Sequence, residues 1–496
     1  MPDVRLATGT GRWILFATVL GSSVAMLDAT VVNVALPRIA DDLGASISGL
    51  QWTINAYTLT LAGFILLGGS LGDRFGRRRI FLIGVVWFAI ASALCGAAQN
   101  VDMLIAARAL QGVGGALLTP GSLAIIQASF ASTDRAKAIG AWSGLGGVAS
   151  AVGPFLGGGL VESVGWRWVF LLNIPLAALA VLVTLRHVPE SHDEQASGHF
   201  DILGAFLAAF ALAGITYALT EGPSGWTGPV IVAALAGLVA AAAFVLVERR
   251  RSAGTGPQPM VPLEVFASRQ FTAVNIITFV MYGGMGVTFF LFVLNLQVVA
   301  GFSPVLSGTA MLPLTACLLL LSARAGALAQ RVGPRLPMTI GLVVASAGML
   351  LLSRIGAGSS YWTEVLPSVT VFGLGLAAVV APLTATVLAS ADVRHAGVAS
   401  GVNNAVARAA SLLAVAAVPP LAGLTGDAFT NPGKFSDGFQ KATVVSAALL
   451  FAGGVLSYLT VKNDVLADAP ADSEPECRVH CAIGAPPLEP TRTSVR

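Results

Sequence analysis

Two short stretches, far apart in the chain, share a residue pattern that decides the expected fold. Residues 69–78 read Gly-Ser-Leu-Gly-Asp-Arg-Phe-Gly-Arg-Arg, and residues 326–335 read Gly-Ala-Leu-Ala-Gln-Arg-Val-Gly-Pro-Arg. Glycine, leucine, arginine, glycine and arginine recur at identical spacing, and each stretch lies between two apolar runs. Hydropathy alone does not produce such a match. The sequence therefore predicts two halves built on one repeated unit, as in many membrane transporter folds.

Apolar runs long enough to cross a membrane surround both stretches. A hydrocarbon core about 30 Å thick requires roughly 20 apolar residues in a helix, and backbone groups in lipid must be hydrogen-bonded internally. We expect fourteen spanning helices: Trp13–Leu36, Trp52–Leu71, Ile80–Ala98, Met103–Phe130, Ala138–Val161, Trp168–Leu185, Ile202–Leu219, Val230–Val247, Phe271–Val299, Val305–Leu328, Leu336–Leu352, Val365–Leu388, Gly397–Leu421 and Ala442–Val461.

The composition of the 496 residues agrees with a membrane protein. Hydrophobic types make up 55% and charged types 11%, whereas soluble domains carry about 25% charged residues. The net charge of +3 is too small to indicate nucleic acid as a partner. The first apolar run is about twice the length of a signal-peptide core and contains Asp28, so we expect it to be a retained span.

The repeat and the loop charges predict an organisation for the chain. If the two stretches correspond, each joins the second and third helices of a six-helix bundle. We expect a cytoplasmic N-terminus (1–12), a first bundle (13–186), a linker with two additional helices (187–261), a second bundle (262–461) and a disordered cytoplasmic tail (462–496). Arginine clusters such as Arg77–Arg79 and Arg249–Arg251 lie on the same side of the membrane as the N-terminus. Because such loops are usually cytoplasmic, we expect both termini on the cytoplasmic side of a bacterial inner membrane. The inserted pair carries few polar residues and is expected at the periphery.

Several motifs resemble those of the major facilitator superfamily, in particular its fourteen-span drug:proton antiporters. The resemblance covers the chain from the first span to the last. Its motifs are Leu27–Pro37 in the first span, Gln51-Trp52 with Tyr57, the loop Gly69–Arg79, Arg108–Gly114 in the fourth span, Gly147 with Gly153–Gly158 in the fifth, and Gly165–Pro175. Gln330 departs from the pattern, because the second loop copy lacks the acid. The resemblance implies an all-α polytopic membrane protein with the major facilitator fold.

The resemblance assigns conformational roles to two of these motifs. It implies that the loop latches the two bundles on the cytoplasmic side and is released as the protein opens inward, through Gly69, Asp73, Arg74, Gly76, Arg77 and Arg78. It associates the fifth-span motif with antiporters, through Gly147, Gly153, Pro154, Gly157 and Gly158. The glycines permit tight turns and close helix packing, and the proline removes a backbone donor and kinks the helix. The alternative for the loop, taken alone, is a topology anchor only.

Asp28 and Arg108 are the candidates for proton coupling. An ionised carboxylate inside an apolar span is costly, so Asp28 is a candidate to bind and release a proton. It lies about 12 Å along its helix from the outer face, and Arg108 lies about 8 Å from the same face. The two side chains are therefore expected to pair. The alternatives are an aspartate that stays permanently paired and an arginine that bonds to backbone carbonyls.

Other polar residues within the spans are candidates for a substrate cavity. They are Asn33, Trp52, Tyr57, Gln111, Asn275, Gln297, Asn403, Asn404 and Arg408. Arg408 lies near the middle of its span without an acidic neighbour in sequence. It either lines the cavity or bonds to backbone carbonyls.

These features favour a proton-coupled antiporter that exports small lipophilic compounds such as drugs, antibiotics or secondary metabolites. A single deeply placed acid favours neutral or monovalent substrates, with protons and membrane lipid as the other partners, and we expect a monomer. A proton symporter or facilitator for a nutrient is the alternative. An enzyme or receptor is disfavoured, because the sequence holds no nucleotide-binding loop, nucleophile or metal motif. The tail cysteines Cys477 and Cys481 with His480 lack a fourth ligand, so no cofactor or metal is expected.

Overall fold

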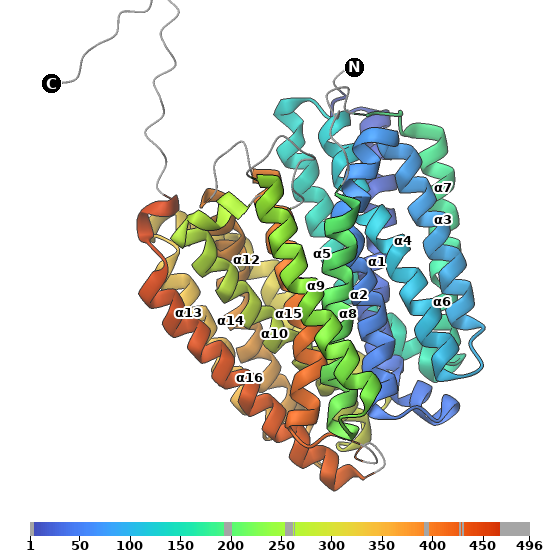
Figure 1. Cartoon of the computed structure of the whole chain (residues 1–496), viewed down its shortest axis with the longest axis vertical. Coiled ribbons are helices and arrows are strands. Elements are labelled where there is room, and N and C mark those ends of the chain that lie inside the picture. Colours follow the sequence, from blue (N-terminus) through green and yellow to red (C-terminus); the bar gives the residue numbers. More distant parts are fainter. Residues whose placement is uncertain are drawn as a thin grey trace, which may run out of the picture.

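The computed structural model describes residues 4–192, 201–252, 261, 263–390, 396–425, 428 and 431–466. Long helices run side by side through this part of the chain, and α1 begins at the end where α16 finishes (Figure 1). Thirteen of them are long and apolar enough to cross a membrane, and the bent helix α2 raises the number to fourteen. The expected all-α polytopic fold is confirmed. The predictions for the tail beyond Leu466, including its cysteines, lie outside the described residues.

The first six spans form one bundle. They are α1 (Gly9–Leu43), α2 (Ile47–Phe75), α3 (Arg77–Gly96), α4 (Val101–Ser129), α5 (Ser132–Ser163) and the pair α6 (Arg167–Leu171) and α7 (Asn173–His187). We call the end at which α2 meets α3 the Gly76 end, and the end at which α5 meets α6 the Gly165 end. The sixth span was predicted as one helix, but it is interrupted at Leu172.

The last six spans form the second bundle. They are α10 (Arg269–Val298), the pair α11 (Pro304–Thr309) and α12 (Leu312–Val332), α13 (Arg335–Leu352), the π-turn η3 (Tyr361–Val365) continued by α14 (Leu366–Ala389), α15 (Ala396–Leu421) and α16 (Pro432–Thr460). The short segments η2 (Leu263–Ala267) and η6 (Asn463–Leu466) flank this bundle.

Local capping explains why several helices extend beyond the predicted apolar runs. The hydroxyl of Thr8 accepts the backbone N–H of Gly11 at the start of α1, and Gly44 ends that helix in a left-handed conformation with φ 63°. The hydroxyl of Ser46 starts α2 in the same way. Capping side chains satisfy backbone groups that have no partner inside the helix. Helix α1 therefore spans 35 residues, because caps rather than hydropathy set its ends.

The two bundles repeat one packing pattern. In the first bundle, α4 packs against α2 and α3, whereas α1 packs against α5 and α7, and α3 against α7. In the second, α14 packs against α12 and α13, whereas α10 packs against α15 and α16, and α13 against α16. Each pair in the first bundle thus has its counterpart in the second, as the repeated stretches predict.

Gly76 and Gly333 occupy equivalent places in this repeat. Gly76 joins α2 to α3 with φ 104°, and Gly333 joins α12 to α13 with φ 84°. A Cβ at Gly76 would lie 2.7 Å from a carboxylate oxygen of Glu190, and one at Gly333 would lie 2.5 Å from the amide oxygen of Asn463. Side chains rarely adopt positive φ, so both joints require glycine for the same two reasons.

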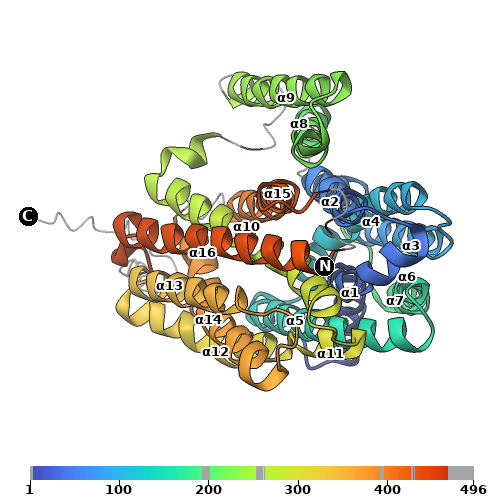
Figure 2. The same cartoon turned by 90° about the horizontal axis from the view of Figure 1, so that it is seen from below.

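The two inserted helices lie outside the bundles. Helix α8 (Ile202–Glu221) packs against α2 of the first bundle and α15 of the second, and α9 (Gly228–Ser252) packs against α8. Seen along the bundle axis, α9 is the outermost helix on that side (Figure 2). Its outer face is apolar, with Val239 at 67% exposure. A surface of this kind suits contact with lipid.

Candidate functional site: a buried ion pair beside a central cavity

Asp28 of α1 and Arg108 of α4 meet in the interior of the first bundle, as the sequence predicts. Arg108 Nη1 donates to Asp28 Oδ2 at 2.5 Å, and the side chains are 0% and 1% exposed for Asp28 and Arg108. Arg108 Nε donates to the backbone carbonyl of Thr53 at 3.0 Å, and its guanidinium lies 4.3 Å from the ring centre of Tyr57. The ion pair, a helix carbonyl and a cation–π contact together hold the guanidinium.

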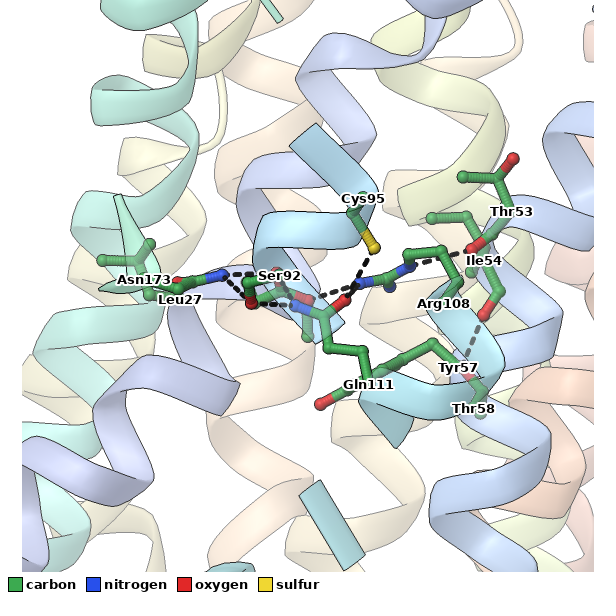
Figure 3. A network of polar contacts seen from close by, with 12 residues as sticks. Leu27, Thr53, Ile54, Tyr57, Thr58, Ser92, Cys95, Arg108, Gln111 and Asn173 are labelled. Carbon is green, nitrogen blue, oxygen red and sulfur yellow. Dashed lines mark hydrogen bonds and ion pairs between the residues drawn. The ribbon is translucent and has the colours of Figure 1, made fainter. Parts of the chain in front are cut away.

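Two amides complete the surroundings of the Asp28 carboxylate. Gln111 Nε2 and Asn173 Nδ2 each donate to Oδ1 at 2.9 Å. Both amides also donate to the hydroxyl of Ser92, at 2.8 Å and 3.3 Å. The contacts run from Asn173 through Ser92 and Gln111 to Arg108 and Thr53 (Figure 3). Helices α1, α2, α3, α4 and the start of α7 therefore converge on one buried carboxylate.

The Asp28 carboxylate acts only as a hydrogen-bond acceptor in this conformation. Its three partners, on Arg108, Gln111 and Asn173, are all N–H donors. A carboxylate accepts from such donors, whereas a protonated carboxyl turns one oxygen into a donor itself. A proton on Asp28 would therefore add a donor to a site whose three protein partners are themselves donors.

A central cavity of about 430 Å³ lies beside the ion pair. Both bundles line it, with α1, α2 and α4 on one side and α10, α14 and α15 on the other. Five of the predicted cavity residues are among its lining: Asn33, Tyr57, Asn403, Asn404 and Arg408. Arg108 also reaches its wall. The volume falls in the range of pockets that hold drug-sized ligands.

The other four predicted cavity residues lie elsewhere. Gln111 belongs to the Asp28 network, and Asn275 accepts a hydrogen bond from Asn403 at 3.2 Å. Gln297 donates to the carbonyl of Val34 at 3.0 Å. Trp52 points to the inserted pair, where its indole N–H donates to Glu221 of α8 at 2.9 Å. None of these four residues lines the central cavity in this conformation, and Gln297 lines a separate pocket that also includes Glu162.

The bundles touch backbone to backbone at the Gly165 end. A Cβ at Gly158 of α5 would lie 2.5 Å from the carbonyl oxygen of Pro304, and one at Gly308 of α11 would overlap the carbonyl oxygen of Pro154. One turn along α5, Glu162 Oε2 accepts the backbone N–H of Val305 at 3.3 Å. The absence of side chains at the two glycines permits this contact. It joins the two bundles at the Gly165 end.

The same face of α5 also packs on the helix that carries Asp28. A Cβ at Gly153 would overlap the hydroxyl of Thr30, and one at Gly157 would lie 2.9 Å from a methyl group of Val31. Helix α5 continues as one helix through Pro154. The fifth-span glycines therefore lie between the Asp28 segment of α1 and α11 of the other bundle. Gly147 lies nearer the Gly76 end. A Cβ there would be 3.8 Å from a methyl carbon of Leu319 of α12.

The loop after α2 makes its contacts within the first bundle. Arg77 pairs with Asp73 at 2.8 Å, and Glu190 accepts the backbone N–H groups of Arg78 and Arg79 at 3.0 and 3.2 Å. The guanidinium of Arg78 also donates to the carbonyl of Leu185 at 3.1 Å. Arg74 lies 5.6 Å from the ring centre of Phe75, and Gly69 lies beside Pro120. Asp73, Arg77 and Arg78 thus bind their own bundle and do not reach across to the second one.

Two members of the Asp28 network were not singled out from the sequence. Ser92 lies inside an apolar helix, where a lone serine is unremarkable. Asn173 lies in the quoted Gly165–Pro175 motif, and it follows the helix break at Leu172. An asparagine within a span is itself a polar group that needs a partner, and this signal could have assigned it to the buried carboxylate.

Among the described residues, no three histidine, cysteine or carboxylate side chains come together closely enough to hold a metal ion. What the site presents is a buried, hydrogen-bonded Asp28 carboxylate beside a cavity lined by both bundles.

Comparisons with known proteins agree with this arrangement. The family model for the Major Facilitator Superfamily matches residues 18–203 and 187–415. The puromycin resistance protein of Streptomyces alboniger is 36% identical over 96% of this chain and 94% of its own length. The methylenomycin A resistance protein of Bacillus subtilis is 34% identical over 89% and 94%. The tetracenomycin C resistance and export protein of Streptomyces glaucescens is 35% identical over 84% and 77%.

Solved structures share the fold at lower sequence identity. A peptide transporter in complex with sulfate superposes with a TM-score of 0.66 at 15% identity, covering 93% of this chain and 98% of the other. A bacterial homologue of the human lysosomal transporter Spinster, inward-facing and unoccupied, gives a TM-score of 0.62 at 16% identity, covering 92% and 97%.

Proposed function

This chain belongs to the major facilitator superfamily, in its drug:proton antiporter branch, and on that premise we propose that it exports small lipophilic compounds in exchange for protons. Relatives of similar length are named for resistance to puromycin and methylenomycin A, or for resistance to and export of tetracenomycin C. Drugs, antibiotics and secondary metabolites are therefore the substrate classes to test.

One observation carries the proposal: a fully buried Asp28–Arg108 pair stands directly beside a cavity that both bundles line. A carboxylate at this depth is expensive to keep charged, and its partner is a wall residue of the cavity. A proton that binds Asp28 weakens the tie to Arg108. The guanidinium also contacts the ring of Tyr57, which lines the cavity. Proton binding and substrate binding are thereby linked through two side chains.

The alternating-access cycle uses the two bundles, residues 13–186 and 262–461, as moving bodies. At the Gly165 end, the close contacts of Gly158 with Pro304 and of Gly308 with Pro154 close the path between the bundles. The arginine-rich loops lie at the opposite, Gly76 end. With those loops in the cytoplasm, the present conformation faces inward. The loop after α2 is then released from the second bundle. Compounds enter the cavity from inside the cell. Both termini are then cytoplasmic in a bacterial inner membrane. A monomer suffices, because one chain builds the whole cavity.

The proposal predicts how energy enters the cycle. One acid at the centre exchanges one proton, so export of a neutral compound moves one net charge inward. The membrane potential then adds roughly 2.3 kcal/mol per 100 mV to the driving force. Burying a second unpaired positive charge costs several kcal/mol, which disfavours divalent cations as substrates.

Inverted membrane vesicles provide the test. An imposed proton gradient is expected to drive uptake of a fluorescent lipophilic compound into the vesicles, and a protonophore is expected to abolish it. Conversely, adding the compound outside the vesicles should release protons on that side. Uptake driven only by a proton gradient of the opposite direction, or compound and proton moving in the same direction, would establish a symporter and contradict export.

A further inference from the structure

Arg408 of α15 is a cation without a partner on the cavity wall. It forms no ion pair or hydrogen bond with any other described residue, and its Nε is buried without a hydrogen bond. Arg108 also lines the cavity, but its guanidinium is hydrogen-bonded to Asp28, Gln111 and the carbonyl of Thr53. The alternative in which Arg408 bonds to backbone carbonyls is therefore not realised in this conformation.

The charges around the cavity do not balance. Among the described residues that line it, the charged ones are Arg108 and Arg408, and no aspartate or glutamate is present. Asp28 neutralises Arg108 from behind the wall. One positive charge remains, and an unpaired cation at this depth in a membrane is costly. Side chains of this kind are retained where they bind a substrate or an ion.

The remaining polar groups of the cavity offer few strong donors. The hydroxyls of Thr58 and Thr384 donate to carbonyls one turn back, at 3.1 Å and 3.0 Å. Asn403 donates to Thr278 at 2.8 Å and to Asn275. These groups present mainly acceptors to a ligand. The Arg408 guanidinium, with the nearby Tyr57 and Tyr282, is the place where a ligand acceptor or anion binds best.

The rest of the wall is apolar. Phe289, Phe290, Val387 and Leu388 line it, so the body of a ligand contacts aromatic and aliphatic carbon. We infer that the cavity selects lipophilic monoanions, compounds with an apolar body and one carboxylate or acidic phenol, and that Arg408 is the residue that binds the acid group. The inference rests on the proposed export function and narrows its substrates from neutral or monovalent compounds to acids.

Ligand binding to the purified protein in detergent tests this without any proton gradient. The probes are pyrenebutanoate, its carboxamide and the corresponding amine, with decanoate and decanamide as a second, smaller series. We expect each carboxylate to bind at least tenfold more tightly than its amide, because an ion pair with Arg408 replaces a hydrogen bond to a neutral acceptor. Arg408→Gln should reduce the ratio to about one, mainly by weakening binding of the carboxylate, and the amide binding that remains shows that the variant is folded.

Two further variants sharpen the test. Arg408→Lys keeps the charge without the planar fork, so part of the preference for carboxylates should remain. Arg324→Gln is the matched control, because Arg324 is an exposed arginine of the same bundle that bonds to the carbonyl of Leu320 outside the cavity; it should change nothing. The inference is overturned if the amide or amine binds the native protein as tightly as the acid. It is also overturned if the preference survives Arg408→Gln, or if neither carboxylate binds. Proton-driven efflux of a neutral compound alongside such results would leave the export function standing.

Discussion

The carboxylate of Asp28 and the guanidinium of Arg108 lie 2.5 Å apart although eighty positions separate them in the chain. Both are almost completely shielded from the surface, and Arg108 forms part of the cavity wall. A titratable group and a potential substrate contact are thus joined by one hydrogen bond.

Asp28→Asn is expected to lower proton-driven efflux at least tenfold while substrate binding persists. Asparagine keeps an acceptor for Arg108 but does not exchange a proton at physiological pH. Efflux into inverted vesicles and binding to purified protein measure the two effects. Asp102→Asn, at the exposed first turn of α4, is the control and should transport normally. An Asp28→Asn protein that still concentrates substrate under a proton gradient would show that Asp28 is not the proton carrier.

Arg108→Gln is expected to destabilise the protein by about 3–5 kcal/mol, because it leaves a buried carboxylate without its cation. The double variant Asp28→Asn/Arg108→Gln removes both charges and should regain much of that loss. The midpoint of thermal unfolding in detergent compares the native protein with the two variants. A double variant as unstable as Arg108→Gln would mean that the contacts to Thr53 and Tyr57, rather than the ion pair, account for the effect.

Gly158→Ala and Gly308→Ala are expected to open the Gly165 end. Each added methyl group collides with a backbone carbonyl of the other bundle, and backbone cannot yield as a side chain can. A cysteine placed at Asn33 in the cavity wall reports the change, since an impermeant maleimide added outside cells should label it several times faster. Gly159→Ala is the matched control, with nothing within 4 Å of the new atom. Equal labelling in all three variants would rule out this contact as the outer gate.

Gly76→Ala is expected to reduce transport severely at normal membrane abundance. Its φ of 104° strains any side chain, and the added atom meets the Glu190 carboxylate that caps α3. Gly72→Ala, in the same loop motif, has ordinary van der Waals space and should transport like the native protein. Immunoblots of membranes alongside efflux rates separate activity from abundance. Normal efflux by Gly76→Ala would leave the loop as a topology anchor.

The sequence alone determined the class of this protein, the number of its spans and the repeat. These follow from local properties: apolar runs of membrane length, and glycines whose spacing recurs where α2 meets α3 and α12 meets α13. Asp28 could be singled out because a charge within an apolar run is conspicuous whatever its neighbours. Its pairing with Arg108 followed from similar depths along two helices, which helix geometry supplies.

Only the tertiary structure decided which polar side chains face the cavity. Trp52 and Tyr57 are both in α2, yet five positions turn a helix by about 140°, so Tyr57 lines the cavity while Trp52 reaches Glu221 on α8. Asn173 and Gln111 join Asp28 because three helices bring them within hydrogen-bond distance. Arg408 has no hydrogen-bond partner among the described residues for the same reason. The rotation of each helix about its axis depends on packing against its neighbours, and neither hydropathy nor motif spacing encodes it.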